Sequence, residues 1–197
     1  MLPPSWDVLS GASEAVAPRL LGCHLIRELH GRTLIGKIVE TEAYDQADAA
    51  SHSYRGPTER TRVMFGPAGY LYVYFTYGMH YCCNVVTGPA GHGSAVLIRA
   101  IEPIEGQEIM LQNRHGVVGK NLTNGPAKVC QALAIDKVLN GHDLREPPLK
   151  LILQPEIPKD QIVQTTRIGI TKDMHRRWRF YINNSGYVSR PVLPNRG

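Results

Sequence analysis

YLYVYFTYGMHYCCNVVT, residues 70–87, is the stretch that decides the fold class. Tyrosines at positions 70, 72 and 74 alternate with the apolar residues between them, and this period of two is that of a β-strand. Tyr77-Gly78 then supplies a turn signal, and Met79–Thr87 has the composition of a returning strand. The stretch therefore predicts a β-hairpin, and a hairpin favours a largely antiparallel sheet.

Strand and helix patterns alternate on both sides of the hairpin. Strands rich in β-branched and aliphatic residues are predicted at Thr33–Tyr44, Ser94–Ala100, Leu149–Gln154, Thr166–Ile170 and Arg179–Ile182. Helices are predicted at Pro18–Leu29, at Glu102–Asn113 after Pro103, and from Pro126 onward. Together with the 197-residue length, these elements predict one mixed α/β domain.

A long polar loop, Asp45–Gly66, separates the first predicted strand from the hairpin. A loop of this length in a compact domain is usually functional or disordered. His52 lies within it. A single histidine in a loop is more often a hydrogen-bonding surface residue than a catalytic one, so both roles stay open for His52 at this point.

The composition is that of an ordinary globular protein with a basic surface. Hydrophobic residues make up 43% and charged residues 20%, and the net charge is +5, which favours a polyanionic partner without proving one. No apolar run approaches the ~20 residues of a membrane helix, and residues 1–18 lack the features of a signal peptide. We therefore expect a cytoplasmic or nucleoid location, or a nuclear one in a eukaryote.

The four cysteines, at positions 23, 82, 83 and 130, show no metal-binding spacing. None forms a C-x-x-C pair, and the two adjacent ones would point to opposite faces of a strand. Structural zinc prefers clustered cysteine and histidine. We therefore expect reduced, mostly buried thiols and no metal site.

Glu40 and Glu42 lie two residues apart on a predicted strand, so both side chains should project from the same face. Two carboxylates on a partly buried strand are costly unless they pair with cations or act on water. One or both could simply anchor an arginine. Arg99, inside an apolar predicted strand, would need such a carboxylate partner, and both glutamates are candidates.

Aromatic and basic residues supply a second group of candidates. Five of the nine tyrosines fall in residues 70–81, where they could pack in the core or stack on nucleobases. Tyr77, at the predicted hairpin tip, could be a wedge that enters a DNA groove or a plain exposed tyrosine. A basic cluster, Lys172–Arg179, could be a solvated loop or an edge that contacts phosphates.

Several blocks of the chain, in order, resemble the alkyladenine (3-methyladenine, methylpurine) DNA glycosylase family. They are Leu20-Leu21-Gly22, VETEAY (39–44), ASHS (50–53), LYVYFTYGM (71–79), Asn84, LIRAIEPIEG (97–106), NGPAKVCQALAI (124–135), RIGI (167–170) and RFY (179–181). The resemblance covers about residues 18–188, after an N-terminal segment of residues 1–17. It implies a single α/β domain with a curved antiparallel sheet, flanking helices and a protruding hairpin, and no cofactor.

The resemblance implies a base-excision-repair enzyme. Such an enzyme flips damaged purines out of duplex DNA and hydrolyses the N-glycosidic bond, which leaves an abasic site. The expected lesions are of the 3-methyladenine, 7-methylguanine, hypoxanthine and ethenoadenine type. Glu42 is assigned as the general base, and Arg99 and the backbone of Ile168 would help to hold the attacking water. Because no lysine takes part in the site motifs, strand cleavage through a Schiff base is not expected.

The same resemblance assigns the pocket and the DNA contacts. Tyr44, His52 and Tyr74 would sandwich the flipped base, and Asn84 would exclude normal guanine by a clash with its exocyclic amine. In the minor groove, Tyr77 would fill the space left in the duplex, beside Met79 and His80. His80 departs from the aromatic residue that the family often has there. The expected partner is damaged double-stranded DNA, bound by a monomer.

Two other functions fit some of these features. A lesion-binding protein on the same fold would lack enzymatic activity, and its hallmark would be loss of the carboxylate that Glu42 supplies. An RNA-binding or RNA-modifying domain could use the same tyrosines. A comparison of cleavage on matched deoxyribose and ribose inosine substrates separates the second alternative from a DNA enzyme.

Overall fold

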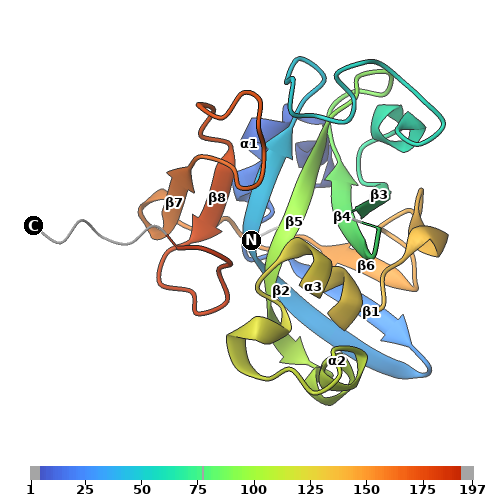
Figure 1. Cartoon of the computed structure of the whole chain (residues 1–197), viewed down its shortest axis with the longest axis vertical. Coiled ribbons are helices and arrows are strands. Elements are labelled where there is room, and N and C mark those ends of the chain that lie inside the picture. Colours follow the sequence, from blue (N-terminus) through green and yellow to red (C-terminus); the bar gives the residue numbers. More distant parts are fainter. Residues whose placement is uncertain (1–4, 77, 192–197) are drawn as a thin grey trace, which may run out of the picture.

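The computed structural model describes residues 5–76 and 78–191 and shows a single mixed α/β domain built on one curved antiparallel sheet (Figure 1). The strands are β1 (His24–Leu29), β2 (Arg32–Tyr44), β3 (Leu71–Thr76), β4 (His80–Val86), β5 (Ala95–Glu105), β6 (Leu149–Ile152), β7 (Ile162–Thr165) and β8 (Arg179–Ile182). The α-helices in these residues are α1 (Ser13–Arg19), α2 (Gln107–Asn113) and α3 (Pro126–Ala132). The mixed fold and the antiparallel sheet are therefore confirmed.

The sheet runs in the order β3-β4-β5-β2-β1-β6, and β8 pairs with β2 and with β7. In Figure 1, β5 and β4 cross the centre, β7 and β8 lie at one side, and β1 and β6 lie at the other. The 13-residue strand β2 is long enough to serve three neighbours. Its first part pairs with β1, its last part pairs with β8 at residues 40–42, and β5 follows its other edge.

The two faces of the sheet have different partners. Side chains such as Ala43, Val85 and Ile98 point into the main hydrophobic core, where α1 and α3 cover the sheet. The N-terminal residues Leu9 and Val16 belong to this core as well. The alternate residues of the same strands point to the opposite face. The period of two therefore separates core positions from those that line the cavity described below.

The predicted hairpin is confirmed as the antiparallel pair β3–β4, which pairs from Leu71↔Val85 to Thr76↔His80. Gly78 has a φ of +68°, a conformation that glycine adopts without steric cost, so the turn signal was interpreted correctly there. Tyr77, at the predicted tip, lies outside the described residues. The strand predicted at Thr33–Tyr44 and the helix predicted from Pro126 are also confirmed.

The helix predicted over Pro18–Leu29 is wrong. The helix α1 ends at Arg19, Gly22 takes a φ of +82°, and His24–Leu29 forms strand β1. The leucine spacing that suggested a helix also suits a turn followed by a strand. β1 forms ladder hydrogen bonds with β2 on one side and with β6 on the other. The spacing of its leucines does not reveal these partners, which favour the strand over the helix.

Two further boundaries are wrong. Residues 102–105 continue β5 instead of starting a helix, and Gly106, with a φ of +71°, precedes α2. Pro103 is accommodated in β5 because the register with β2 shifts between Ile35 and Gly36, opposite it. Thr166–Ile170 is not a strand; it is a loop after β7, and the Ile168 amide bonds to a side chain instead of a neighbouring strand.

The four cysteines are free and buried, as expected. Within the part of the chain that the structure describes, none of the helices combines the length and apolar character that a membrane span requires.

Candidate active site

A cavity of about 660 Å³ opens on the sheet face opposite the core. Strands β2 to β5 form its floor, and the loops after β2 and after β7 form its sides. Its wall contains six of the side chains singled out by the sequence: Tyr44, His52, Tyr74, Asn84, Arg99 and Ile168. The fold therefore brings together residues that are up to 124 positions apart in the chain.

The Glu42 carboxylate lies directly behind this wall and has no exposed surface. Three groups bind it. The Tyr44 hydroxyl donates to Oε2 at 2.7 Å, the Ile168 amide donates to Oε1 at 2.8 Å, and Arg99 Nη1 lies 3.3 Å from Oε2. All three residues line the cavity. The carboxylate is therefore held in one orientation, one side-chain layer beneath the cavity surface.

Arg99 reaches both glutamates because of an irregularity in the sheet. The pairing of β2 with β5 goes from Glu40↔Ala100 to Thr41↔Ile98, so that Arg99 has no partner across the ladder. Such a bulge re-aims the side chain it carries. Arg99 Nε donates to Glu40 Oε1 at 3.0 Å while Nη1 faces Glu42. The predicted carboxylate partner of Arg99 is confirmed, and it is both glutamates.

Glu40 anchors cations and lies away from the cavity. Besides Arg99, it accepts from Arg179 Nε at 2.7 Å, and from the amide and hydroxyl of Ser189 at 2.7 and 2.8 Å. Burial alone would raise the pKa of Glu40, but Arg99, Arg179 and the Ser189 amide outweigh it, and the pKa lies below its ordinary value. The structural alternative considered for the two glutamates therefore holds for Glu40.

Aromatic rings form one side of the cavity. His52 packs edge-on against Tyr74, with ring centroids 4.5 Å apart, and Tyr74 stacks on Tyr72 at 5.6 Å. The Tyr72 hydroxyl and His52 Nδ1 are 3.1 Å apart. The hydrogen bond from Asn84 Nδ2 to the Tyr72 carbonyl, 3.0 Å, fixes the Asn84 amide. These contacts hold the rings and the amide at fixed positions around the cavity.

The residues of the basic cluster predicted at Lys172–Arg179 have different surroundings in the structure. Lys172 lines the cavity and is exposed, whereas Arg179 is buried against Glu40 and is not part of a surface. Between them, the Arg176 guanidinium lies 4.5 Å from the centre of the Trp178 ring. At the hairpin, Met79 is 69% exposed and His80 is half-buried. Tyr77, between β3 and β4, falls outside the described residues.

Sequence reasoning missed Arg167, Asp48 and Ser189. Arg167 stands in the quoted RIGI block, and a lone arginine in an apolar run is a signal for a buried ion pair that could have been used. Asp48 lies in a polar loop, and Ser189 follows β8 by seven residues, so neither has a local signal. Their roles depend on contacts across more than 100 positions of the chain.

The His52 imidazole should stay neutral across the neutral pH range. Desolvation by the surrounding protein atoms is the main cause, and the positive charge of Arg60 adds to it, so that the pKa of His52 falls from 6.5 to about 4. His52 is nevertheless an exposed residue that lines the cavity. Because the unfolded chain takes up this proton at higher pH, the shift removes stability from the folded state as pH falls from about 6.5 toward 4.

This prediction is checked by following the ring carbon and nitrogen shifts of His52 by NMR from pH 3 to 8. Arg60→Gln should raise the pKa of His52 partway toward its ordinary value. Arg32→Gln, on the far part of β2, makes the same change in net charge and should leave it unaltered. A native His52 that titrates near 6.5 would contradict the prediction.

Comparison with known proteins identifies close relatives across nearly the whole length. The family model described as Methylpurine-DNA glycosylase (MPG) matches residues 7–186. A protein of Carboxydothermus hydrogenoformans is 55% identical over 89% of this chain and 92% of its own length. A protein of Methanoculleus marisnigri is 51% identical over the same shares. A protein of Nitrosospira multiformis is 45% identical over 97% and 95%. Each is named "Putative 3-methyladenine DNA glycosylase".

Proposed function

Because this chain belongs to the methylpurine-DNA glycosylase family, we propose that it flips damaged purines out of duplex DNA and hydrolyses their N-glycosidic bond with an activated water. It is a DNA glycosylase of alkylation-damage repair. The proposed lesions are 3-methyladenine and 7-methylguanine, which are cationic, and hypoxanthine and ethenoadenine, which are neutral. The product is an abasic site in an uncut strand.

One observation carries this proposal: a buried carboxylate lies behind a cavity walled by aromatic rings. The cavity, at about 660 Å³, falls within the range of about 300–1,000 Å³ that is typical of small-molecule sites. Aromatic faces stack on any base. A carboxylate both offsets the positive charge of an oxocarbenium-like sugar and accepts a proton from water. Glu42, Tyr44, His52 and Tyr74 supply these groups in one place.

In the proposed mechanism, Glu42 removes a proton from the water that attacks the anomeric carbon of the sugar. In the structure, the Ile168 amide and Arg99 Nη1 bind Glu42 directly. A water reaches the carboxylate by inserting between Glu42 and these two donors. The donors then hydrogen-bond to the water from the side opposite Glu42.

We propose that Tyr44 stacks on one face of the flipped base, and that His52 and Tyr74 contact it from the other side. A neutral His52 suits a cationic base, since a second positive charge at 52 would repel it. Asn84, which also lines the cavity, screens against normal guanine by a clash with its exocyclic amine. On the basis of the family resemblance, Tyr77 fills the vacated stack, with Met79 and His80 beside it in the minor groove.

The test of this function is a lesion panel on duplex DNA, scored for abasic sites. Excision of at least one methylated purine is expected, with faster excision from deoxyribose than from matched ribose inosine. Tight binding to lesion DNA without excision would favour the non-enzymatic alternative. Equal or faster cleavage of the ribose substrate would favour the RNA alternative.

The same panel also shows whether the enzyme cuts the strand. We expect none of the product to be nicked on gels run without alkali or heat, and no borohydride-trapped complex. Lys172 lines the cavity but is exposed, whereas a lysine nucleophile is normally activated by desolvation or a neighbouring cation. Lys172→Ala should therefore keep excision. Nicks or a trapped complex that disappear in Lys172→Ala would overturn the monofunctional mechanism.

A further inference from the structure

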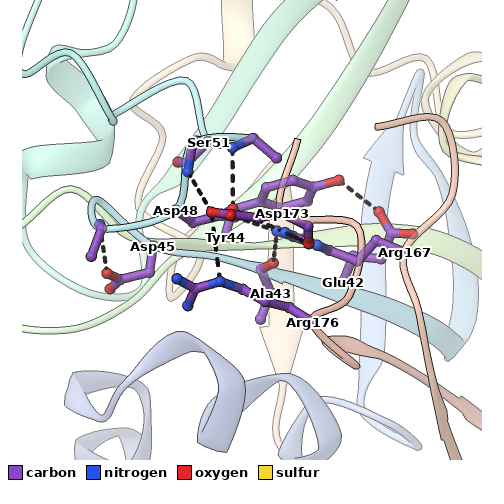
Figure 2. A network of polar contacts seen from close by, with 12 residues as sticks. Glu42, Ala43, Tyr44, Asp45, Asp48, Ser51, Arg167, Asp173 and Arg176 are labelled. Carbon is purple, nitrogen blue, oxygen red and sulfur yellow. Dashed lines mark hydrogen bonds and ion pairs between the residues drawn. The ribbon is translucent and has the colours of Figure 1, made fainter. Parts of the chain in front are cut away.

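A buried ion pair stands behind the proposed stacking face of Tyr44. The side chains of Arg167 and Asp48 have no exposed surface. Arg167 Nη1 and Nη2 donate to the two carboxylate oxygens of Asp48 in a bidentate arrangement, with 2.9 Å for Nη2. Figure 2 shows this pair beside Tyr44, whose hydroxyl points to Glu42. The described mechanism uses neither charge of the pair.

The Arg167 guanidinium also lies over two aromatic rings. Its central carbon is 4.7 Å from the centre of the Tyr44 ring and 5.4 Å from that of Trp178. Tyr44 lines the cavity, and the buried Arg167 does not reach it in the part of the chain that the structure describes. The Tyr44 ring therefore separates a permanent positive charge from the space proposed for the base.

Arg167 also connects the segments that carry the site. Its Nη1 donates to the Ala43 carbonyl at 3.0 Å, on the residue before Tyr44 (Figure 2). The next residue, Ile168, donates its amide to Glu42. Asp48 lies on the loop that carries His52, and its Oδ1 accepts from the Ala50 amide at 3.1 Å. The pair thus fixes the position of Tyr44 relative to both sides of the cavity.

We propose that Asp48 neutralises Arg167 so that the Tyr44 stacking face accepts cationic as well as neutral bases. Aromatic rings that interact have centroids about 4.5–7 Å apart, which would put a stacked base roughly 9–12 Å from the guanidinium. At that distance an uncompensated unit charge behind the ring changes the affinity for a cationic base by about tenfold at an effective dielectric constant near 20. The same charge leaves the affinity for a neutral base almost unchanged.

Asp48 and Arg167 are therefore positioning residues that also set specificity, and this role rests on the proposed function. The alternative is that the pair only holds the two loops together. The two explanations differ in one measurable quantity, the ratio of the affinity for 7-methylguanine to the affinity for hypoxanthine. Structural damage lowers the affinity for both bases alike, whereas an unbalanced positive charge lowers the affinity for the cationic base alone.

The experiment measures single-turnover excision of 7-methylguanine and of hypoxanthine from matched duplexes. It also measures binding to duplexes that carry non-hydrolysable 2′-fluoro analogues of both nucleotides. Binding does not need hydrolysis, so an enzyme that fails to excise either base defeats the proposed function without removing this readout. Native protein, Asp48→Asn, Arg167→Gln and the double variant Asp48→Asn/Arg167→Gln are compared, after their folding has been checked by thermal melting.

We expect Asp48→Asn, which leaves Arg167 charged and unpaired, to lower the ratio of the affinity for 7-methylguanine to the affinity for hypoxanthine by about tenfold. The double variant restores neutrality, so its affinity ratio returns to within about twofold of the native value even if both affinities are lower. Arg167→Gln removes the cation, and its affinity ratio should rise. Asp160→Asn, on an exposed residue, makes the same change in net charge and should leave the ratio unaltered.

Equal losses of affinity for both bases in Asp48→Asn would overturn the proposal in favour of a purely structural pair. If Asp48→Asn fails to fold, Arg167→Gln decides: it leaves the negative charge of Asp48 uncompensated behind Tyr44, so a charge-balancing role requires the affinity ratio to rise, and an unchanged ratio overturns the proposal. A ratio that falls in Arg167→Gln or in the double variant contradicts a charge-balancing role, because neither carries an uncompensated cation behind Tyr44.

Discussion

Glu42→Gln should lose nearly all excision while it keeps its affinity for lesion DNA. Glutamine has the same size, and its amide oxygen can still accept from the Ile168 amide or the Tyr44 hydroxyl. It cannot take a proton from water or offset a cationic sugar. Positioned acid–base catalysis contributes about 10²–10⁴-fold, roughly 3–5 kcal/mol, and the lost charge stabilisation adds to this.

The structure indicates that this variant folds. Arg99 retains Glu40 at 3.0 Å after Glu42 loses its charge, so its buried guanidinium stays paired. Binding should survive because phosphate contacts and stacking supply most of the affinity for DNA. Single-turnover excision and lesion-DNA affinity are the two measurements.

Glu102→Gln is the matched control. It makes the same substitution on β5 in a half-exposed residue that pairs with Lys37, and it should excise at the native rate. A Glu42→Gln enzyme with more than about a tenth of native activity would be incompatible with a general base at this position, given the 10²–10⁴-fold expectation.

Glu40→Gln should destabilise the fold strongly. Glu40 and its partners Arg99 and Arg179 are 0%, 6% and 3% exposed, and removing one member of such a buried cluster typically costs 3–5 kcal/mol because a charge is left uncompensated. For a chain of this size that corresponds to a fall in Tm on the order of 6–20 °C. Urea denaturation measures the loss in free energy of unfolding directly.

The loss should depend on pH with a defined sign. The pKa of Glu40 is below 4.5 in the folded protein, so its charged form contributes stability above that pH. As pH falls through the folded pKa, the contribution disappears and the native protein approaches the variant. Adding Arg179→Met to Glu40→Gln removes one unpaired cation and should recover part of the loss. Native-like stability of Glu40→Gln at pH 7 would show that the cluster is not a structural anchor.

The two glutamates therefore separate into different roles although they lie two residues apart. Because Glu40 holds Arg99, which in turn faces Glu42, Glu40→Gln is not a neutral comparison for a Glu42 variant. Any loss of excision in Glu40→Gln has to be measured on the folded fraction. If the folded fraction of Glu40→Gln is inactive and Glu42→Gln is active, the assignment of the general base moves to residue 40.

Local sequence pattern already groups the side chains that share a strand face. A strand alternates its side chains with a period of two whatever its neighbours are, so Glu40 with Glu42, and Tyr72 with Tyr74, could be grouped before any fold was known. The Tyr77-Gly78 turn signal placed the hairpin, because glycine tolerates the positive φ found at Gly78. Family blocks spread over most of the chain then supplied the proposed identity of the site.

Which of these faces meet, and how the arginines are shared between them, depends on contacts between segments far apart in the chain. The ladder hydrogen bonds of a sheet are the same for every residue type, so local pattern does not specify that β8 lies against β2 at residues 40–42. It also does not specify the bulge that turns Arg99 toward two carboxylates. The loop that presents the Ile168 amide looked like a strand, because an apolar run has the same composition whether its amides bond to a strand or to Glu42.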